Sequence, residues 1–126
     1  MSRFEEFDRQ AASLRSTRPT ISIRTRGTLG INRAAYEALG RPRAVKLLWG
    51  AKERVVGFRP SQENSPKAYL VSETKPNSGS CEVAGTKFFK TYGIAYDRCR
   101  RYAAEMEDGD LLFSLDRDEK GCTRIT

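Results

Sequence analysis

Two stretches of this chain, residues 20–60 and 68–115, carry the same order of local sequence signals. Each stretch has the pattern of a strand, a turn, a second strand, a short helix and a two-stranded hairpin. One such unit has an apolar face that it cannot bury alone, whereas two units can bury it against each other. We therefore predict a mainly β fold with residues 1–126 in one domain, in which the two units form a small barrel about a pseudo-two-fold axis.

The first unit shows these signals most clearly. Ile21 and Ile23 alternate with polar residues, which is typical of a half-buried strand. Asn32 can cap the helix that follows, and Gly40 stands where a left-handed residue ends a helix. The hairpin after it ends at Pro60. These residues predict the complete order of elements for the first unit.

The second unit repeats the order with different loops. A short, strongly apolar helix ends at Gly93, and alternating residues from Tyr102 to Met106 lead into Asp108-Gly109, a signal for a type I′ hairpin turn. The helix-ending glycines of the two units are 53 residues apart, and the last phenylalanines of the two hairpins are 55 apart. Agreement of several landmarks in order favours a true internal repeat.

The two ends of the chain lie outside the repeat. Residues 2–16 space Phe4, Phe7, Ala11 and Leu14 three or four apart, which predicts an amphipathic helix. The helix is expected to pack on the domain. It could instead be a self-association helix or a docking arm for a protein partner. A membrane-surface helix is disfavoured because its polar face mixes both charges. Residues 116–126 lack periodicity and are expected to form a loose tail.

Composition narrows the function classes. The chain has no histidine, and its three cysteines are widely spaced, so the sequence offers no common zinc pattern and no Cys-His or Ser-His-Asp arrangement. We expect three free thiols, no catalytic residues, no metal and no cofactor, hence a protein that is not an enzyme. The chain has no apolar run of the roughly 18–20 residues that span a membrane. The polar N-terminus does not resemble a secretory signal, which favours a cytoplasmic location.

The excess of positive charge is confined to one half of the chain. The net charge is +7, and residues 18–60 alone hold ten basic and two acidic residues, a net of +8. Residues 67–126 are balanced, with ten of each. An excess on one of two similar units predicts a barrel with one cationic side, suited to duplex DNA. The candidate DNA-binding residues are Arg24, Arg26, Arg33, Arg41, Arg43 and Lys46.

The first unit resembles the AbrB/MazE/SpoVT family of swapped-hairpin barrels. The matching segments are Arg24-Thr25-Arg26-Gly27, Ile31 through Leu39-Gly40, and Val55 through Arg59-Pro60. The second unit matches more weakly. The chain has Ile31-Asn32 where the family usually has Ile-Pro. The resemblance implies a swapped-hairpin barrel, normally built from two chains, whose first hairpin and neighbouring loops face DNA.

Together these observations predict a DNA-binding protein, of the kind that regulates transcription in the cytoplasm and nucleoid. The alternative is a protein-interaction module, comparable to an antitoxin or scaffold, that uses residues 2–16 and the barrel surface without binding DNA. Steep salt-dependent binding to duplex DNA would favour the first function. Capture of an acidic protein without DNA binding would favour the second.

Overall fold

Antiparallel strands are the main secondary structure of the described chain, as the alternating patterns predict. The computed structural model describes residues 18–74, 79–116 and 118–119. The helix predicted for residues 2–16 lies outside these described residues. Within the predicted loose tail, Asp118 and Glu119 form a short strand.

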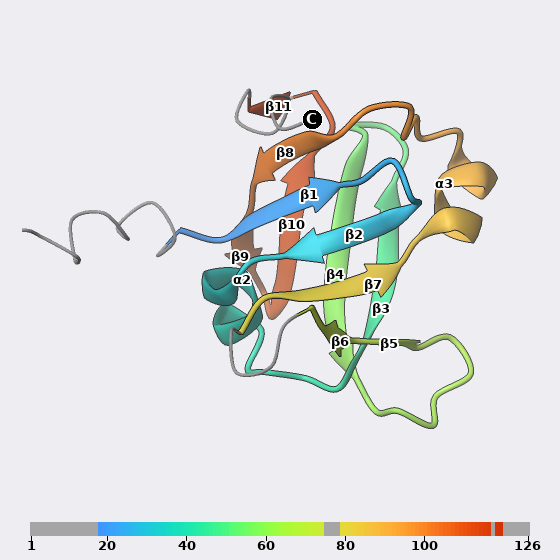
Figure 1. Cartoon of the computed structure of the whole chain (residues 1–126). Helices are drawn as coiled ribbons and strands as arrows, with labels where there is room; N and C mark the ends of the chain where they lie inside the picture. Colours follow the sequence, from blue (N-terminus) through green and yellow to red (C-terminus); the bar gives the residue numbers. More distant parts are fainter. Residues whose placement is uncertain (1–17, 75–78, 117, 120–126) are drawn as a thin grey trace, which may run out of the picture.

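The strands form two sheets that lie face to face, with the strands of one crossing those of the other at a steep angle (Figure 1). Sheet A has the order β11-β8-β1-β2-β7-β6, and sheet B has the order β5-β3-β4-β10-β9. The strands of sheet A are β1 (Thr20–Ile23), β2 (Thr28–Ile31), β6 (Ser72–Glu73), β7 (Cys81–Ala84), β8 (Arg100–Ala103) and β11 (Asp118–Glu119). The strands of sheet B are β3 (Ala44–Gly50), β4 (Val55–Ser61), β5 (Tyr69–Leu70), β9 (Glu105–Glu107) and β10 (Asp110–Ser114).

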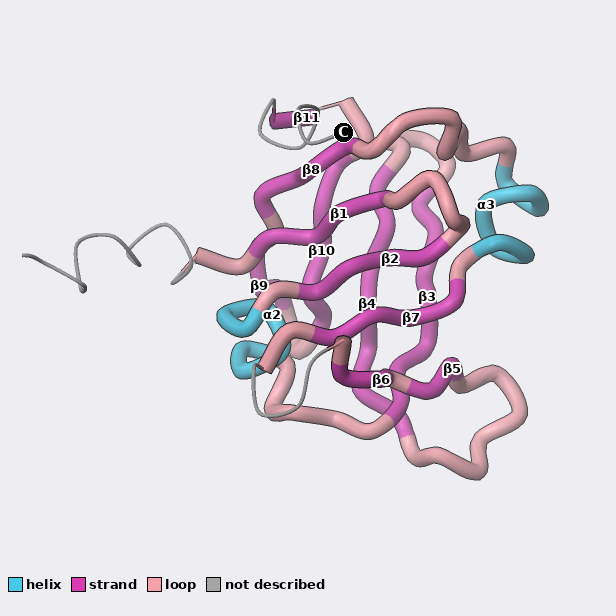
Figure 2. Tube along the Cα trace, viewed as in Figure 1, coloured by secondary structure: helices cyan, strands magenta, loops and turns pink. Residues whose placement is uncertain are grey.

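Two short helices lie at the rims of the sheets, α2 (Arg33–Ala38) and α3 (Thr86–Tyr92) (Figure 2). The predicted cap of α2 is confirmed, because Asn32 Oδ1 accepts a hydrogen bond of 2.9 Å from the Ala35 N–H. Gly40, with φ of +85°, and Gly93, with φ of +66°, are left-handed where the helices end. The sequence therefore predicts both helices and their ends.

The second hairpin is confirmed at its turn and differs in its first strand. Asp108 and Gly109 have φ values of +53° and +87°, as a type I′ turn requires. The strand predicted from Tyr102 to Met106 is interrupted at Ala104, where the chain leaves sheet A as β8 and enters sheet B as β9. The alternation of apolar residues in the sequence runs on to Met106 and does not show this crossing. In the structure Tyr102 and Ala104 are buried, whereas Met106 is exposed.

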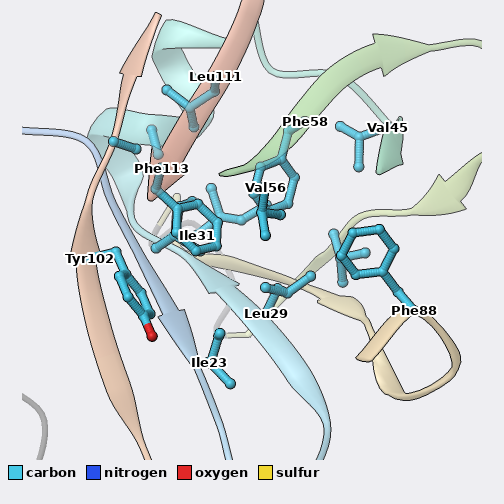
Figure 3. Packing of buried hydrophobic residues seen from close by; sticks show 14 of the residues in the cluster. Ile23, Leu29, Ile31, Val45, Val56, Phe58, Phe88, Tyr102, Leu111 and Phe113 are labelled. Atoms are coloured by element: carbon cyan, nitrogen blue, oxygen red, sulfur yellow. The ribbon is translucent and has the colours of Figure 1, made fainter. Parts of the chain in front are cut away.

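The core lies between the facing sides of the two sheets. Figure 3 shows Ile23 and Leu29 of sheet A opposite Val56 and Phe58 of sheet B, all of them buried. Across this interface the ring centroids of Tyr102 and Phe113 are 4.9 Å apart. Aromatic pairs at such distances pack favourably beyond the area that they bury. The core thus joins sheet A to sheet B through apolar contacts.

The two sheets are not closed into the barrel that the sequence predicts. Segments 69–73 and 100–107 each pass from one sheet to the other, as β5 to β6 and as β8 to β9. Corners of this kind are typical of sheets that pack at a large angle. Among the described strands, each sheet still ends in edge strands, which are β11 and β6 in sheet A and β5 and β9 in sheet B.

The first unit has the order strand, strand, helix, strand, strand, and the second has it if β5 with β6 and β8 with β9 are each counted as one strand. With that counting, the strand pairings of the two units correspond. Pair β1–β2 corresponds to β6–β7, and β3–β4 corresponds to β9–β10. Pair β1–β8 corresponds to β3–β5, while β2–β7 and β4–β10 join equivalent strands of the two units. Only the pairing of β11 has no counterpart among the described strands.

Candidate nucleic-acid interface

The turn between β1 and β2 carries Arg24 and Arg26, the first two residues of the predicted set. Gly27 has φ of +89°, which favours glycine, and its N–H donates to the Arg24 carbonyl over 2.8 Å. The Gly27 carbonyl accepts from the Gly85 N–H, at the start of α3, also over 2.8 Å. The second unit therefore holds the turn of the first and fixes where the two guanidinium groups lie.

Glu82 on β7 forms ion pairs with both arginines. Its Oε1 lies 3.4 Å from Arg24 Nη1 and 3.2 Å from Arg26 Nη2. The Arg26 side chain is 66% exposed and that of Arg24 is 36% exposed. Exposed pairs of this kind contribute about 0–1 kcal/mol, because water screens them and the long side chains lose freedom. The two arginines therefore remain available to a second anion.

A shallow hollow of about 320 Å³ lies on the outer face of sheet A, with Thr20, Ser22, Arg24 and Arg101 among its lining residues. Ser22 on β1 is paired in register with Gly30 on one side and with Arg101 of β8 on the other. The floor thus consists of small and hydroxyl-bearing residues, and guanidinium groups stand beside it. No ion pair of Arg101 is present among the described side chains.

Gly30 lets the Arg24 side chain lie flat across this hollow. A Cβ atom at Gly30 would be 2.5 Å from Arg24 Nη2 and 2.7 Å from its Cζ, which is closer than real Cβ contacts come. Any larger residue would therefore displace the guanidinium. The absence of a side chain at this position determines how Arg24 is presented on the sheet.

Asn32 holds the opposite end of the hollow. Besides capping α2, its Oδ1 accepts from the Thr20 N–H over 3.0 Å. Its Nδ2 donates to the Arg18 carbonyl and to Thr20 Oγ1, each over 2.8 Å. A proline at this position could make none of these side-chain bonds. Asn32 therefore ties the start of β1 to the start of α2.

Arg33 and Arg41 lie at the two ends of α2 and share Glu37. The distances to Glu37 Oε2 are 3.2 Å from Arg33 Nε and 3.1 Å from Arg41 Nη2. The hydrogen bonds that Arg41 and then Arg33 donate hold the pKa of the Glu37 carboxyl below its usual value. All three side chains are largely exposed, so these pairs are also open to exchange with another anion.

The other two predicted residues lie further away. Arg43 is 82% exposed and forms an ion pair of 3.5 Å with Glu63. Lys46 belongs to β3 and is in register with Arg59, so it lies on sheet B.

The structure therefore divides the predicted set into separate groups. Arg24 and Arg26 precede β2, and Arg33 and Arg41 follow it at the other end of the strand (Figure 1). The expectation of one continuous cationic side that includes Lys46 is wrong in this respect. Arg101, which is not among the residues predicted from the sequence, lies beside the first group. The sequence does contain a signal for Arg101. It is adjacent to the buried Tyr102 on a strand, and neighbouring side chains of a strand point to opposite faces, so the side chain of Arg101 points outward.

The cysteines differ from the expected three free thiols. Cys99 is disulfide-bonded, whereas Cys81 is a free, buried thiol. Burial raises the pKa of the Cys81 thiol. The side chains that the structure describes contain no group of three or more His, Cys, Asp or Glu placed to hold a metal ion.

Searches of family models, curated proteins and solved structures found no match to this chain. Among the described helices, none is long and apolar enough to cross a membrane.

Proposed function

We propose that this chain binds duplex DNA through the arginine face, defined as Arg24, Arg26 and Arg101 on the outer side of sheet A. The observation that supports the proposal is the hollow that Arg24 and Arg101 flank, since its floor has no bulky side chain. Arginine presents its donors in a planar fork that matches phosphate geometry. Among the described side chains, these three guanidinium groups stand against one carboxylate, that of Glu82, and Glu119 of β11 is in register with Arg101.

The proposal extends to the origin of the fold. The two units would be tandem copies of an AbrB-like swapped-hairpin motif, joined so that one chain supplies what two chains supply in the resembled family. The symmetric pairing of strands supports this origin. The first copy would provide the DNA-facing hairpin. The second would hold that hairpin in place through Gly85 and Glu82.

The separate position of the α2 arginines limits the number of phosphates that we expect the arginine face to bind. Three neutralised phosphates correspond to a log–log salt slope of about −2.7. A transcription regulator would additionally read base edges, for which bidentate arginine contacts to guanine are the commonest chemistry. Arg24 and Arg26, at the turn that protrudes from sheet A, would be the residues that reach a groove.

The test is a salt series of gel shifts with a duplex oligonucleotide. The Arg24→Ala/Arg26→Ala variant should bind more weakly, and its salt slope should become shallower, about −0.9, because two phosphate contacts are lost. The Arg101→Ala variant loses one contact, so the magnitude of its slope should fall by about 0.9.

The control is Lys52→Ala/Arg59→Ala, which removes the same charge from sheet B and should leave the slope unchanged. Absence of a shift for the wild-type protein at low salt would refute DNA binding. Equal losses in the two double variants would show that net charge, and not the arginine face, determines binding.

A further inference from the structure

The outer face of sheet B is apolar at its centre. Leu48 on β3 and Leu112 on β10 meet over Gly57 of β4, where a Cβ would lie 2.7 Å from Leu112 Cδ2 and 3.2 Å from Leu48 Cδ1. Val55 follows on the same side of β4. We call Leu48, Val55, Gly57 and Leu112 the leucine face. The solvent side of an antiparallel sheet is ordinarily polar, so an apolar centre indicates a surface that something covers.

No described helix covers this face, because both helices lie at the rims (Figure 2). Beside the leucine face is a hollow of about 620 Å³ between the β9–β10 hairpin and the β3–β4 turn. Val55 and Leu112 line it on the apolar side, and Glu105 and Glu107 line it on the acidic side. The surface is therefore an apolar strip with an acidic rim.

The described chain begins at the edge of this surface. The Pro19 carbonyl accepts a hydrogen bond of 3.0 Å from the Ala104 N–H. Ala104 immediately precedes β9, which is an edge strand of sheet B, and its neighbours Ala103 and Glu105 line the hollow. Pro19 therefore lies beside one end of the hollow, and residues 1–17 precede it closely in the sequence.

The length and pattern of the preceding segment fit the surface. Residues 2–16 as a helix would be about 22 Å long. A five-stranded sheet, with strands about 4.8 Å apart, is roughly 19 Å across. The stripe of Phe4, Phe7 and Leu14 offers large apolar side chains. Arg15 and Arg18 stand just before Pro19, close in sequence to the point where the chain reaches Glu105.

We propose that residues 2–16 form a helix that docks its apolar stripe on the leucine face of the same chain. Docking would remove the side chains of the leucines and of both phenylalanines from water, which is favourable. The inference is independent of DNA binding, because the arginine face is on the other sheet.

The experiment compares amide spectra and hydrogen exchange of full-length variants. Phe4→Ala/Phe7→Ala should shift the amide signals of Leu48, Gly57 and Leu112 and leave those of Ser22 and Gly30 in place. Amides of residues 2–16 should lose protection by about tenfold or more. The reciprocal variant Leu112→Glu should cause the same loss of protection. Glu5→Ala, on the polar side of the predicted helix, is the matched control and should change neither.

Two results would overturn the proposal. Shifts confined to sheet A, or the absence of any shift in sheet B, would show that the segment does not dock on the leucine face. Sheet B shifts that grow with protein concentration, together with a dimer in light scattering, would show that the occupant is a second copy. Because the substituted phenylalanines precede the described core, the dispersion of sheet A signals reports in every variant whether the domain is folded.

Discussion

The outer faces of the two sheets are built by the same alternation and differ in chemistry. On sheet A the outward positions around Gly30 are Ser22, Glu82, Arg24 and Arg101, so the face is polar and holds more guanidinium groups than carboxylates among the described side chains. On sheet B the outward positions around Gly57 are Leu48 and Leu112, with carboxylates at the rim. Each face has a glycine at its centre that is covered by neighbouring side chains. The Arg24 guanidinium covers Gly30 on sheet A, and Leu48 and Leu112 cover Gly57 on sheet B.

This difference separates the part of each sheet that forms the core from the part that is open to contact with other molecules. The inward sides of the two sheets have the same chemistry, since each supplies aliphatic and aromatic side chains to one core. The outward sides differ in charge and polarity, and only these sides are open to contact with another molecule. Four experiments would test the comparison, beginning with the one that should affect both faces.

Phe58→Ala should have the largest effect, because this buried ring packs on Phe113 and stands at the centre of the shared core. We expect a loss of about 3–5 kcal/mol in the free energy of unfolding. Urea unfolding followed by circular dichroism would measure it. If the two faces rest on one core, DNA binding and the spectra of both sheets should be lost in one transition. Two separate transitions would contradict a shared core.

The two central glycines should respond differently to alanine. Gly57→Ala forces both leucines aside and should cost about 1–2 kcal/mol of stability. Gly30→Ala meets only the end of the flexible Arg24 side chain, so stability should change by less than about 0.5 kcal/mol while DNA affinity falls. Thermal unfolding and gel shifts on both variants would check this. A reversed pattern would mean that Arg24 does not serve the arginine face.

Glu82→Gln should sharpen the contrast by increasing the positive charge of sheet A. The variant releases Arg24 and Arg26 from their shared carboxylate and removes a charge that repels phosphate. We expect DNA affinity to rise about 2–5-fold, on the order of 0.5–1 kcal/mol. Glu37→Gln, which frees the α2 arginines instead, is the control and should have less effect. Unchanged or weaker binding by Glu82→Gln would count against the proposed site.

The smallest effect should come from the ion pair on sheet B. Arg59 Nε and Nη2 donate to Asp110 over 2.9 and 3.0 Å, which lowers the pKa of the Asp110 carboxyl. A carboxyl whose pKa is lower in the folded state stabilises the protein above its unfolded pKa of about 3.9. This stabilisation is lost as the pH falls through the folded value. Unfolding experiments should therefore show that the gap between wild type and Asp110→Asn closes below about pH 4. A gap that does not depend on pH would contradict it.

Much of the local structure follows from neighbouring residues. The cap at Asn32, the left-handed glycines that end both helices and the Asp108-Gly109 turn depend on interactions within a few positions. These interactions are encoded in adjacent side chains. The outward placement of Arg24 follows in the same way from the alternation that precedes it.

The candidate site was predictable only in part. Arg24 and Arg26 come together because they share one turn, whereas Arg101 joins them through the register of β1 with β8, about 80 residues apart in sequence. No local pattern encodes that register. No local pattern shows that Glu82 pairs with Arg24 and Arg26, because Glu82 belongs to the second unit and is distant from the turn in sequence.

The sequence by itself predicted the elements of the first unit, the helix and the Asp108-Gly109 turn of the second, and the half of the chain that carries the excess charge, because periodicity, caps and turns act over a few residues. The tertiary structure decided that the sheets pack face to face without closing, that Lys46 lies on the sheet opposite Arg24, and that the outer faces differ in chemistry. These properties depend on pairings between distant strands, and the shared core selects those pairings because only certain registers bury all of its apolar side chains together.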